Sequence, residues 1–337
     1  QLRVSGYLKN VNIQTTPVID SNNQVDLDVQ VEEAPSAEAS ASLGFGTNGL
    51  QFNAKVNQHN FMGTGRTVGL GFNASRWGQD YSFNFYNPFF TNTGVGRGLN
   101  LYYSRVDPKG LDVSVYASNR FGGDVNYSIP LSDFSSMQLG FGYQNLSIQS
   151  VGSVQQTRAF VTDHGTRFNE IRLASGWSRS TYDQMPFPTK GTSQQFSALV
   201  ALPATRESLS YYKVSYLARW FQPLWYDFIF SLKGNVSYGN SFDSNVGLPF
   251  FENYYAGGIV QPGQVRGFAD YSLGPRDNFN NSLGANLLVD GMASVILPYP
   301  LSRDTLRTSI FADAGNVYAK GTPTRYAGTD SGPLRYS

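Results

Sequence analysis

Apolar and polar residues alternate along most of the chain from residue 36 onward. In residues 50–57, leucine, phenylalanine, alanine and valine alternate with glutamine, asparagine, lysine and asparagine. The same period recurs in residues 67–74, 137–144 and 212–220. A period of two places successive side chains on opposite faces of a β-strand. The pattern predicts thirteen strands after residue 35, each with one apolar and one polar face.

A two-sheet sandwich shows the same alternation, but the polar faces and strand lengths favour a membrane barrel. The polar faces carry glutamine, asparagine, lysine and glycine, which suit a wet lumen. The strands run about ten residues, enough to cross a bilayer when tilted. Such a sheet must close, because an open edge in lipid leaves backbone groups unpaired. We therefore predict an all-β fold, a transmembrane antiparallel β-barrel, whose lipid-facing residues include Leu50, Phe52, Val56, Leu70, Phe72 and Tyr216.

The connections between the predicted strands fall into two kinds. One kind is compact and rich in aromatic residues and proline, as in residues 60–63, 87–90 and 221–224. The other is longer and more polar, as in residues 149–167 and in residues 240–282, which we call the long loop. Short turns at one rim and longer loops at the other are typical of outer-membrane barrels.

Residues 1–34 differ from the rest of the chain. They contain two predicted strands, and the second alternates over residues 25–31. Two strands do not form a stable domain alone, so we interpret residues 1–34 as the tail of a larger periplasmic domain and residues 35–337 as the barrel region. No signal peptide is visible in the first residues, which have neither a charged start nor an apolar core, so we expect a mature or trimmed fragment.

The composition excludes several classes of protein. The chain has 337 residues, a net charge of +1, no cysteine, 35 glycines and 15% aromatic residues. Its mean hydropathy is −0.30, and no apolar run approaches the length of a membrane-spanning helix. The lack of cysteine excludes thiol catalysis and disulfides. The balanced charge argues against a nucleic-acid partner.

The sequence carries no enzyme signature. Neither of the two histidines, His59 and His164, has a cysteine, histidine or carboxylate at the spacing of a metal site. The glycine pairs in residues 44–46 and 69–71 lie in predicted strands with no helix after them, so they are not phosphate-binding loops. We expect no catalytic residues, no metal and no cofactor.

The long loop and one later strand carry the candidate chemistry. Gly257 and Gly258 allow positive φ angles and close backbone packing, and Arg266 offers five donors in a fixed fork. Asp313 falls on the polar face of its strand, so it can pair with Arg266 if the loop folds inward. The alternatives are a solvated surface loop and an aspartate that meets only water in the lumen.

Val265, Arg266, Gly267 and Phe268, preceded by residues 251–258, resemble the sixth-loop signature of the BamA family, which assembles β-barrels in the outer membrane of Gram-negative bacteria. The resemblance implies a barrel of about sixteen strands, of which about three lie beyond this sequence. It implies that residues 1–34 end a POTRA domain, a small α/β periplasmic module. It also implies that the loop enters the lumen and that Arg266 pairs with Asp313. Ser294 stands where the family commonly has a second acid, so one acidic partner is expected instead of two.

The first barrel strand is unusual, because its outward face begins with Ala37, Ala39 and Ala41. Small residues give little cross-strand packing. In the resembled family this strand meets the last strand weakly, and the resemblance implies a lateral seam that admits client strands by edge pairing.

The resemblance further implies a central barrel subunit of the β-barrel assembly machinery, the BAM complex. Its implied partners are the BAM lipoproteins (BamD and others), unfolded outer-membrane protein clients, and outer-membrane lipid and lipopolysaccharide. A two-partner secretion transporter of the same superfamily and a passive porin are the alternatives.

Overall fold

The structure, a computed structural model, describes residues 8–17, 25–33, 35–46, 49–76, 78–107, 116–152, 154–205, 208–259, 261–298, 306–329 and 332–337. The chain divides into two compact units, Gln1–Ser104 and Arg105–Ser337. The elements are β1 (Leu8–Pro17), β2 (Val25–Glu33), β3 (Ala37–Gly46), β4 (Gly49–Gln58), η2 (Phe61–Gly63), β5 (Thr67–Ser75), β6 (Gly78–Asn87), β7 (Gly96–Val106), β8 (Tyr116–Ser132), β9 (Ser135–Val151), α1 (Gln155–His164), β10 (Arg167–Ser180), β11 (Gly191–Pro203), β12 (Tyr211–Pro223), η3 (Trp225–Asp227), β13 (Ile229–Ser241), η4 (Phe250–Glu252), β14 (Leu287–Ile296), β15 (Ser309–Tyr318) and β16 (Arg335–Tyr336).

The predicted all-β fold is confirmed. Within the described residues, β3 to β16 are hydrogen-bonded in chain order in one antiparallel sheet of 14 strands. Thirteen of these, β3 to β15, match the predicted number, and β16 lies in the final residues. No helix in the described part of the chain has the length and apolar character needed to cross a membrane.

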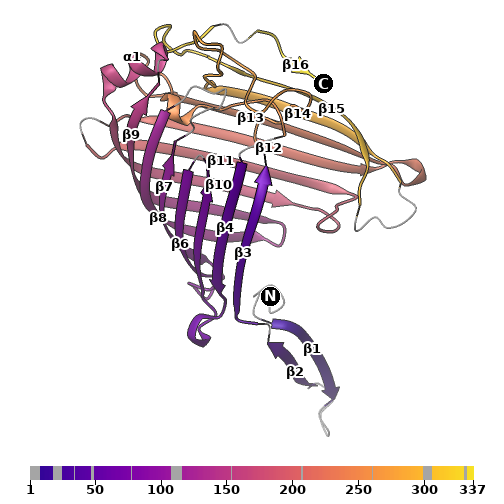
Figure 1. Cartoon of the computed structure of the whole chain (residues 1–337). Helices are drawn as coiled ribbons and strands as arrows, with labels where there is room; N and C mark the ends of the chain where they lie inside the picture. Colours follow the sequence, from indigo (N-terminus) through magenta and orange to yellow (C-terminus); the bar gives the residue numbers. More distant parts are fainter. Residues whose placement is uncertain are drawn as a thin grey trace. The chain divides into compact units, whose positions relative to one another are not determined.

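The first unit contains two separate sets of paired strands. β1 and β2 form a two-stranded antiparallel hairpin (Figure 1), and the alternating residues Val25, Leu27, Val29 and Val31 of β2 are exposed. Residue 34, at the predicted domain boundary, lies outside the described residues, and the division at this point stays a prediction.

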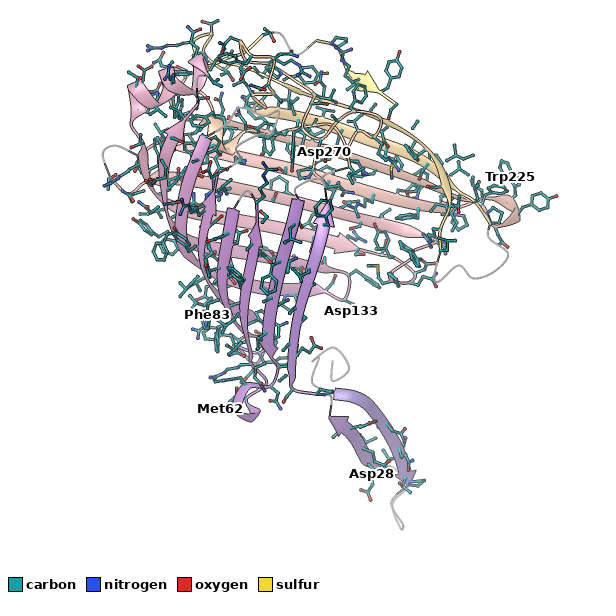
Figure 2. The ribbon with its side chains drawn as sticks, viewed as in Figure 1. Asp28, Met62, Phe83, Asp133, Trp225 and Asp270 are labelled. Carbon is teal, nitrogen blue, oxygen red and sulfur yellow. The ribbon has the colours of Figure 1, made fainter. Side chains whose placement is uncertain are left out.

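Strands β3 to β6 place their apolar residues on a common face. Val56 on β4 lies opposite Leu70 on β5, and Leu70 lies opposite Phe83 on β6, which is labelled in Figure 2. Leu50, Leu70 and Val56 are at least half exposed. Large apolar side chains that stay exposed in a continuous belt are what a lipid-facing surface requires.

The second unit repeats this arrangement in longer strands. Phe196 on β11, Tyr216 on β12 and Val236 on β13 are direct cross-strand partners, and all three are exposed. The opposite face of β12 carries polar residues such as Lys213 and Arg219, because side chains alternate along a strand. We call this second face the inner face.

The turns at the two rims of the second unit differ, as predicted. Asp133 lies in the turn between β8 and β9, and Trp225 lies in the turn between β12 and β13 (Figure 2). Strand direction alternates, so both turns lie at one rim, whereas α1 and the long loop begin at the other.

Residues 149–167, predicted as a longer polar connection, do connect β9 to β10, but the sequence did not indicate the helix within them. The segment contains the helix α1, which ends at Gly165 with φ 83°. Phe160 is buried on this helix and contacts the rings of Phe168 and Phe250. The helix is stabilised by this tertiary contact, since a ten-residue helix is marginal alone.

Candidate functional site: the docked long loop

The long loop connects β13 to β14 and folds back onto the inner face. In Figure 1 the orange segment between these strands lies along the sheet, and Figure 2 labels its Asp270 over the strands. Its contacts with the inner face come from widely separated positions. Glu252 binds Lys213 of β12, Gln261 binds Arg219 of β12, Gly263 binds Asp290 of β14, and Arg266 binds Asp313 of β15.

The two predicted glycines form the base of a small hairpin within the loop. Gly258 N–H donates to the Val265 carbonyl at 2.9 Å, and Val265 N–H donates to the Gly258 carbonyl at 3.1 Å. Gly257 and Gly258 have φ angles of 113° and 74°. A Cβ at position 257 would lie 2.6 Å from the Ala269 carbonyl oxygen, and a Cβ at 258 would overlap the Asp270 carboxylate. Both the angle and the close packing therefore require glycine here.

The structure brings Arg266 and Asp313 together. Arg266 Nε donates to Asp313 Oδ2 at 2.6 Å, and Nη2 donates to Oδ1 at 2.8 Å. The Arg266 backbone N–H also donates to Oδ2, at 3.1 Å. The guanidinium carbon lies 3.1 Å from the centre of the Phe311 ring. The Asp313 side chain is 0% exposed and that of Arg266 is 24% exposed, so this two-point pair is largely shielded from water.

The neighbours of the motif explain its position. Val265 is fully buried with Ala256, Leu273, Ala285, Leu288 and Val317, and Phe268 packs against this cluster. Gly315 on β15 makes room for it, because a Cβ there would lie 2.8 Å from Val265 Cγ2. Gly267, directly after the arginine, has a φ angle of 86°, which favours glycine.

A second carboxylate contacts the loop, and sequence reasoning missed it. Asp290 on β14 is buried; its Oδ1 accepts hydrogen bonds from Gly263 N–H at 3.1 Å and from Asn235 Nδ2 at 2.7 Å. Lys233 Nζ lies 3.4 Å from Oδ2. Ser294, where the resemblance implies a second acid, is buried on the same strand. Among the described residues, Arg266 contacts one acid, Asp313, as expected. The loop as a whole contacts two acids, Asp313 and Asp290.

The first half of the loop has an ionic contact that the sequence did not indicate. Lys213 Nζ donates to Glu252 Oε2 and to the Glu252 carbonyl oxygen, both at 2.9 Å. Arg120 and Arg172 each lie 4.0 Å from Oε1. Burial acts to raise the pKa of Glu252, but the charges of Lys213, Arg172 and Arg120 outweigh it and hold the pKa below its ordinary value.

The residues of the predicted seam lie on β3, which pairs with β4. Ala39 lies opposite Val56 and Ala41 opposite Ala54, and Ala37, Ala39 and Ala41 are all exposed. β3 is at one end of the strand order within the described residues. The seam itself stays a prediction.

The histidines lie apart from the loop contacts described above. His59 follows β4, with its Nε2 3.9 Å from Glu38, and His164 ends α1, with its Nε2 3.2 Å from the Tyr326 hydroxyl. In the part of the chain that the structure describes, no group of three or more His, Cys, Asp or Glu residues has the arrangement of a metal site.

Comparison with known proteins places the chain in a family. The Omp85 superfamily domain matches residues 60–337. The chain is 29% identical to the outer membrane protein assembly factor BamA of Neisseria meningitidis over 94% of its length and 24% identical to BamA of Neorickettsia risticii over 95%. It spans 42% of the length of each of these two relatives.

Solved structures agree with this assignment. The crystal structure of BamA from Haemophilus ducreyi lacking POTRA domains 1–3 matches 99% of this chain and 69% of that chain, with a TM-score of 0.80 and 25% identity. CdiB from Escherichia coli matches 95% of this chain and 59% of that chain, with a TM-score of 0.60 and 13% identity, a likeness of fold alone. The chain therefore belongs to the Omp85 superfamily, and its strands are those of a transmembrane β-barrel of the outer membrane.

Proposed function

We propose that this chain is the barrel region of a factor that folds and inserts other β-barrel proteins into the outer membrane. The observation that carries the proposal is the long loop, held on the inner face by Arg266 and Asp313 in a chain that matches BamA over nearly its whole length. A passive porin needs an open aqueous lumen, whereas here the loop covers part of the inner face with buried residues such as Val265.

The mechanism that we propose uses no nucleotide, cofactor or catalytic residue. A weakly held β3 offers unpaired backbone groups to an incoming client strand, which adds to the edge by main-chain hydrogen bonds. The small side chains of Ala37, Ala39 and Ala41 reduce the cross-strand contacts that would otherwise hold this edge closed. The docked loop keeps the inner face ordered while the edge exchanges partners.

The partners follow from the same proposal. The substrates are unfolded outer-membrane proteins, the surroundings are outer-membrane lipid and lipopolysaccharide, and the accessory subunits are the BAM lipoproteins, BamD among them. A two-partner secretion transporter is the competing function, and the 29% identity to a BamA over 94% of this chain favours assembly.

Depletion of the protein in its own host tests the function. The abundance of outer-membrane proteins is measured by quantitative mass spectrometry as the protein declines. We expect many unrelated barrels to fall together and to return when the intact gene is restored. Loss of one exported protein with normal barrel levels would indicate a secretion transporter, and loss of small-solute uptake alone would indicate a porin.

A further inference from the structure

Glu252 is the one carboxylate in η4, the three-residue helical turn of the long loop. Its side chain is almost fully buried, at 8% exposed. Its carboxylate meets a cluster of three cations that we call the cation cradle: Arg120 on β8, Arg172 on β10 and Lys213 on β12. These three strands are different from β14 and β15, which hold Asp290 and Asp313. The loop is therefore fixed at two places on the inner face.

One member of the cation cradle, Arg172, is held in place by the barrel wall itself. Arg172 Nη1 donates to Gln144 Oε1 at 2.5 Å, and Gln144 is 1% exposed on β9. Gln144 Nε2 lies 3.5 Å from Glu170 Oε2, which also accepts the Tyr211 hydroxyl at 2.9 Å. None of these contacts involves the loop. An arginine that is already held in place loses less entropy when its partner docks.

Aromatic residues before and after Glu252 in the sequence also contact the barrel wall. Phe251 is buried, with its ring 5.0 Å from that of Phe168. On the other side, Lys213 Nζ lies 4.6 Å from the centre of the Tyr254 ring. A buried charge that loses its partners is strongly unfavourable, so the docked position of this segment depends on the pairing with the cation cradle.

From this arrangement we infer that Glu252 is a positioning residue that anchors the entrance of the long loop, independently of the Arg266–Asp313 pair. The two anchors lie on either side of the hairpin formed by Gly258 and Val265. Together they connect the β8–β12 part of the wall to β15. The effect on client assembly rests on the proposed function, whereas the docking of the loop does not.

The test measures loop exposure in the purified full-length protein, in lipid nanodiscs, by hydrogen exchange followed by mass spectrometry. In Glu252→Gln we expect exchange in residues 246–258 to rise by about tenfold or more, with a smaller change in residues 262–272. Arg266→Ala should show the opposite distribution. Glu252→Asp should restore part of the protection, because it keeps the charge. Glu38→Gln, at an exposed glutamate outside the loop, is the matched control.

Double variants test the independence of the anchors. Glu252→Gln combined with Lys213→Met should be little worse than Glu252→Gln alone, since both remove one interaction, whereas Glu252→Gln with Arg266→Ala should be additive. Resistance of the barrel to SDS at room temperature checks that each variant is folded. Native protection in Glu252→Gln would overturn the anchor, and equal opening of both segments in each single variant would overturn its independence.

The same variants separate the anchor from the proposed function. Barrel levels are measured in cells that carry Glu252→Gln as the sole copy, and we expect them to fall as exchange rises. If the loop opens in the purified protein while client barrels assemble normally, the link between this anchor and assembly is rejected. If depletion of the intact protein also leaves the barrels unchanged, the proposed function fails instead.

Discussion

Arg266 and Asp313 are 47 residues apart in the sequence, yet two nitrogens of one guanidinium meet both oxygens of one carboxylate at 2.6 and 2.8 Å. The pair joins the long loop to β15, and the ring of Phe311 covers the guanidinium. An arginine held in this way presents its planar fork to the acid, which a lysine does not reproduce. The consequences of this pair are open to measurement.

Arg266→Ala and Asp313→Ala should each weaken loop docking by about 2–3 kcal/mol, between the values for exposed and fully buried pairs. The value is intermediate because Arg266 is still 24% exposed. Cleavage of the loop by added protease measures the change. The double variant should be little worse than either single variant, and Arg266→Lys should recover only part of the protection. Fully additive effects of the two alanine variants would show that they do not act through one contact.

Gly315 should be as important for docking as the ion pair. Gly315→Ala places a Cβ 2.8 Å from Val265 Cγ2, and we expect a loss of about 1–3 kcal/mol from overpacking. Val265→Ala in the same chain should restore part of the protection, because it removes the colliding methyl group. Gly234→Ala is the matched control, since no heavy atom lies within 4 Å of that added Cβ. If both glycine variants lose protection equally, the close contact with Val265 is not the cause.

The lipid-facing belt gives a prediction that does not involve the loop. Leu70→Arg should destabilise the folded barrel by about 2–4 kcal/mol if the position is near the middle of the bilayer, whereas Asn53→Arg should have a mild effect. Leu70 is 57% exposed on the apolar face, and Asn53 belongs to the polar face of β4. Urea unfolding in lipid vesicles measures both variants. Equal losses would show that both faces meet the same environment.

The seam predicts where client proteins touch the chain. A photo-crosslinking amino acid at Ala39 on β3 should capture unfolded outer-membrane proteins during assembly, because in the proposed mechanism β3 offers its edge to them. The same group at Ala54 should capture few, since β4 is hydrogen-bonded to strands on both sides. Affinity purification and mass spectrometry identify the products. Equal capture at the two positions would remove β3 as the entry edge.

The entrance anchor predicts an acid-sensitive loop. The pKa of Glu252 in the folded protein is below its ordinary value, so its contribution is fully present above the ordinary glutamate range and is lost as pH falls through the lower folded pKa. Exchange in residues 246–258 should therefore rise at strongly acidic pH in the intact protein. Glu252→Gln lacks this carboxylate. The difference in exchange between the intact protein and the variant therefore separates the effect of Glu252 from that of Asp313. If the difference in exchange between the two proteins stays constant across the whole pH range, ionised Glu252 does not anchor the loop.

The alternating pattern determined most of the fold without any tertiary information. Leu70 and Tyr216 were assigned to the apolar face from their spacing alone, and both are exposed on that face. Strand alternation is a local property, because neighbouring side chains point to opposite faces wherever the strand lies. For the same reason the inward direction of Asp313 was readable from its strand, and its pairing with Arg266 followed once the loop motif was seen.

Only the tertiary structure decided what surrounds the loop. Nothing in the sequence distinguishes Glu252 from another loop acid, because its partners come from three strands that are distant in the sequence. Asp290 and the helix α1 were missed for the same reason. Whether a carboxylate pairs with a cation, or a ten-residue segment stays helical, depends on packing between distant elements. That packing is set by the strand register and the course of the loop, and no local period encodes it.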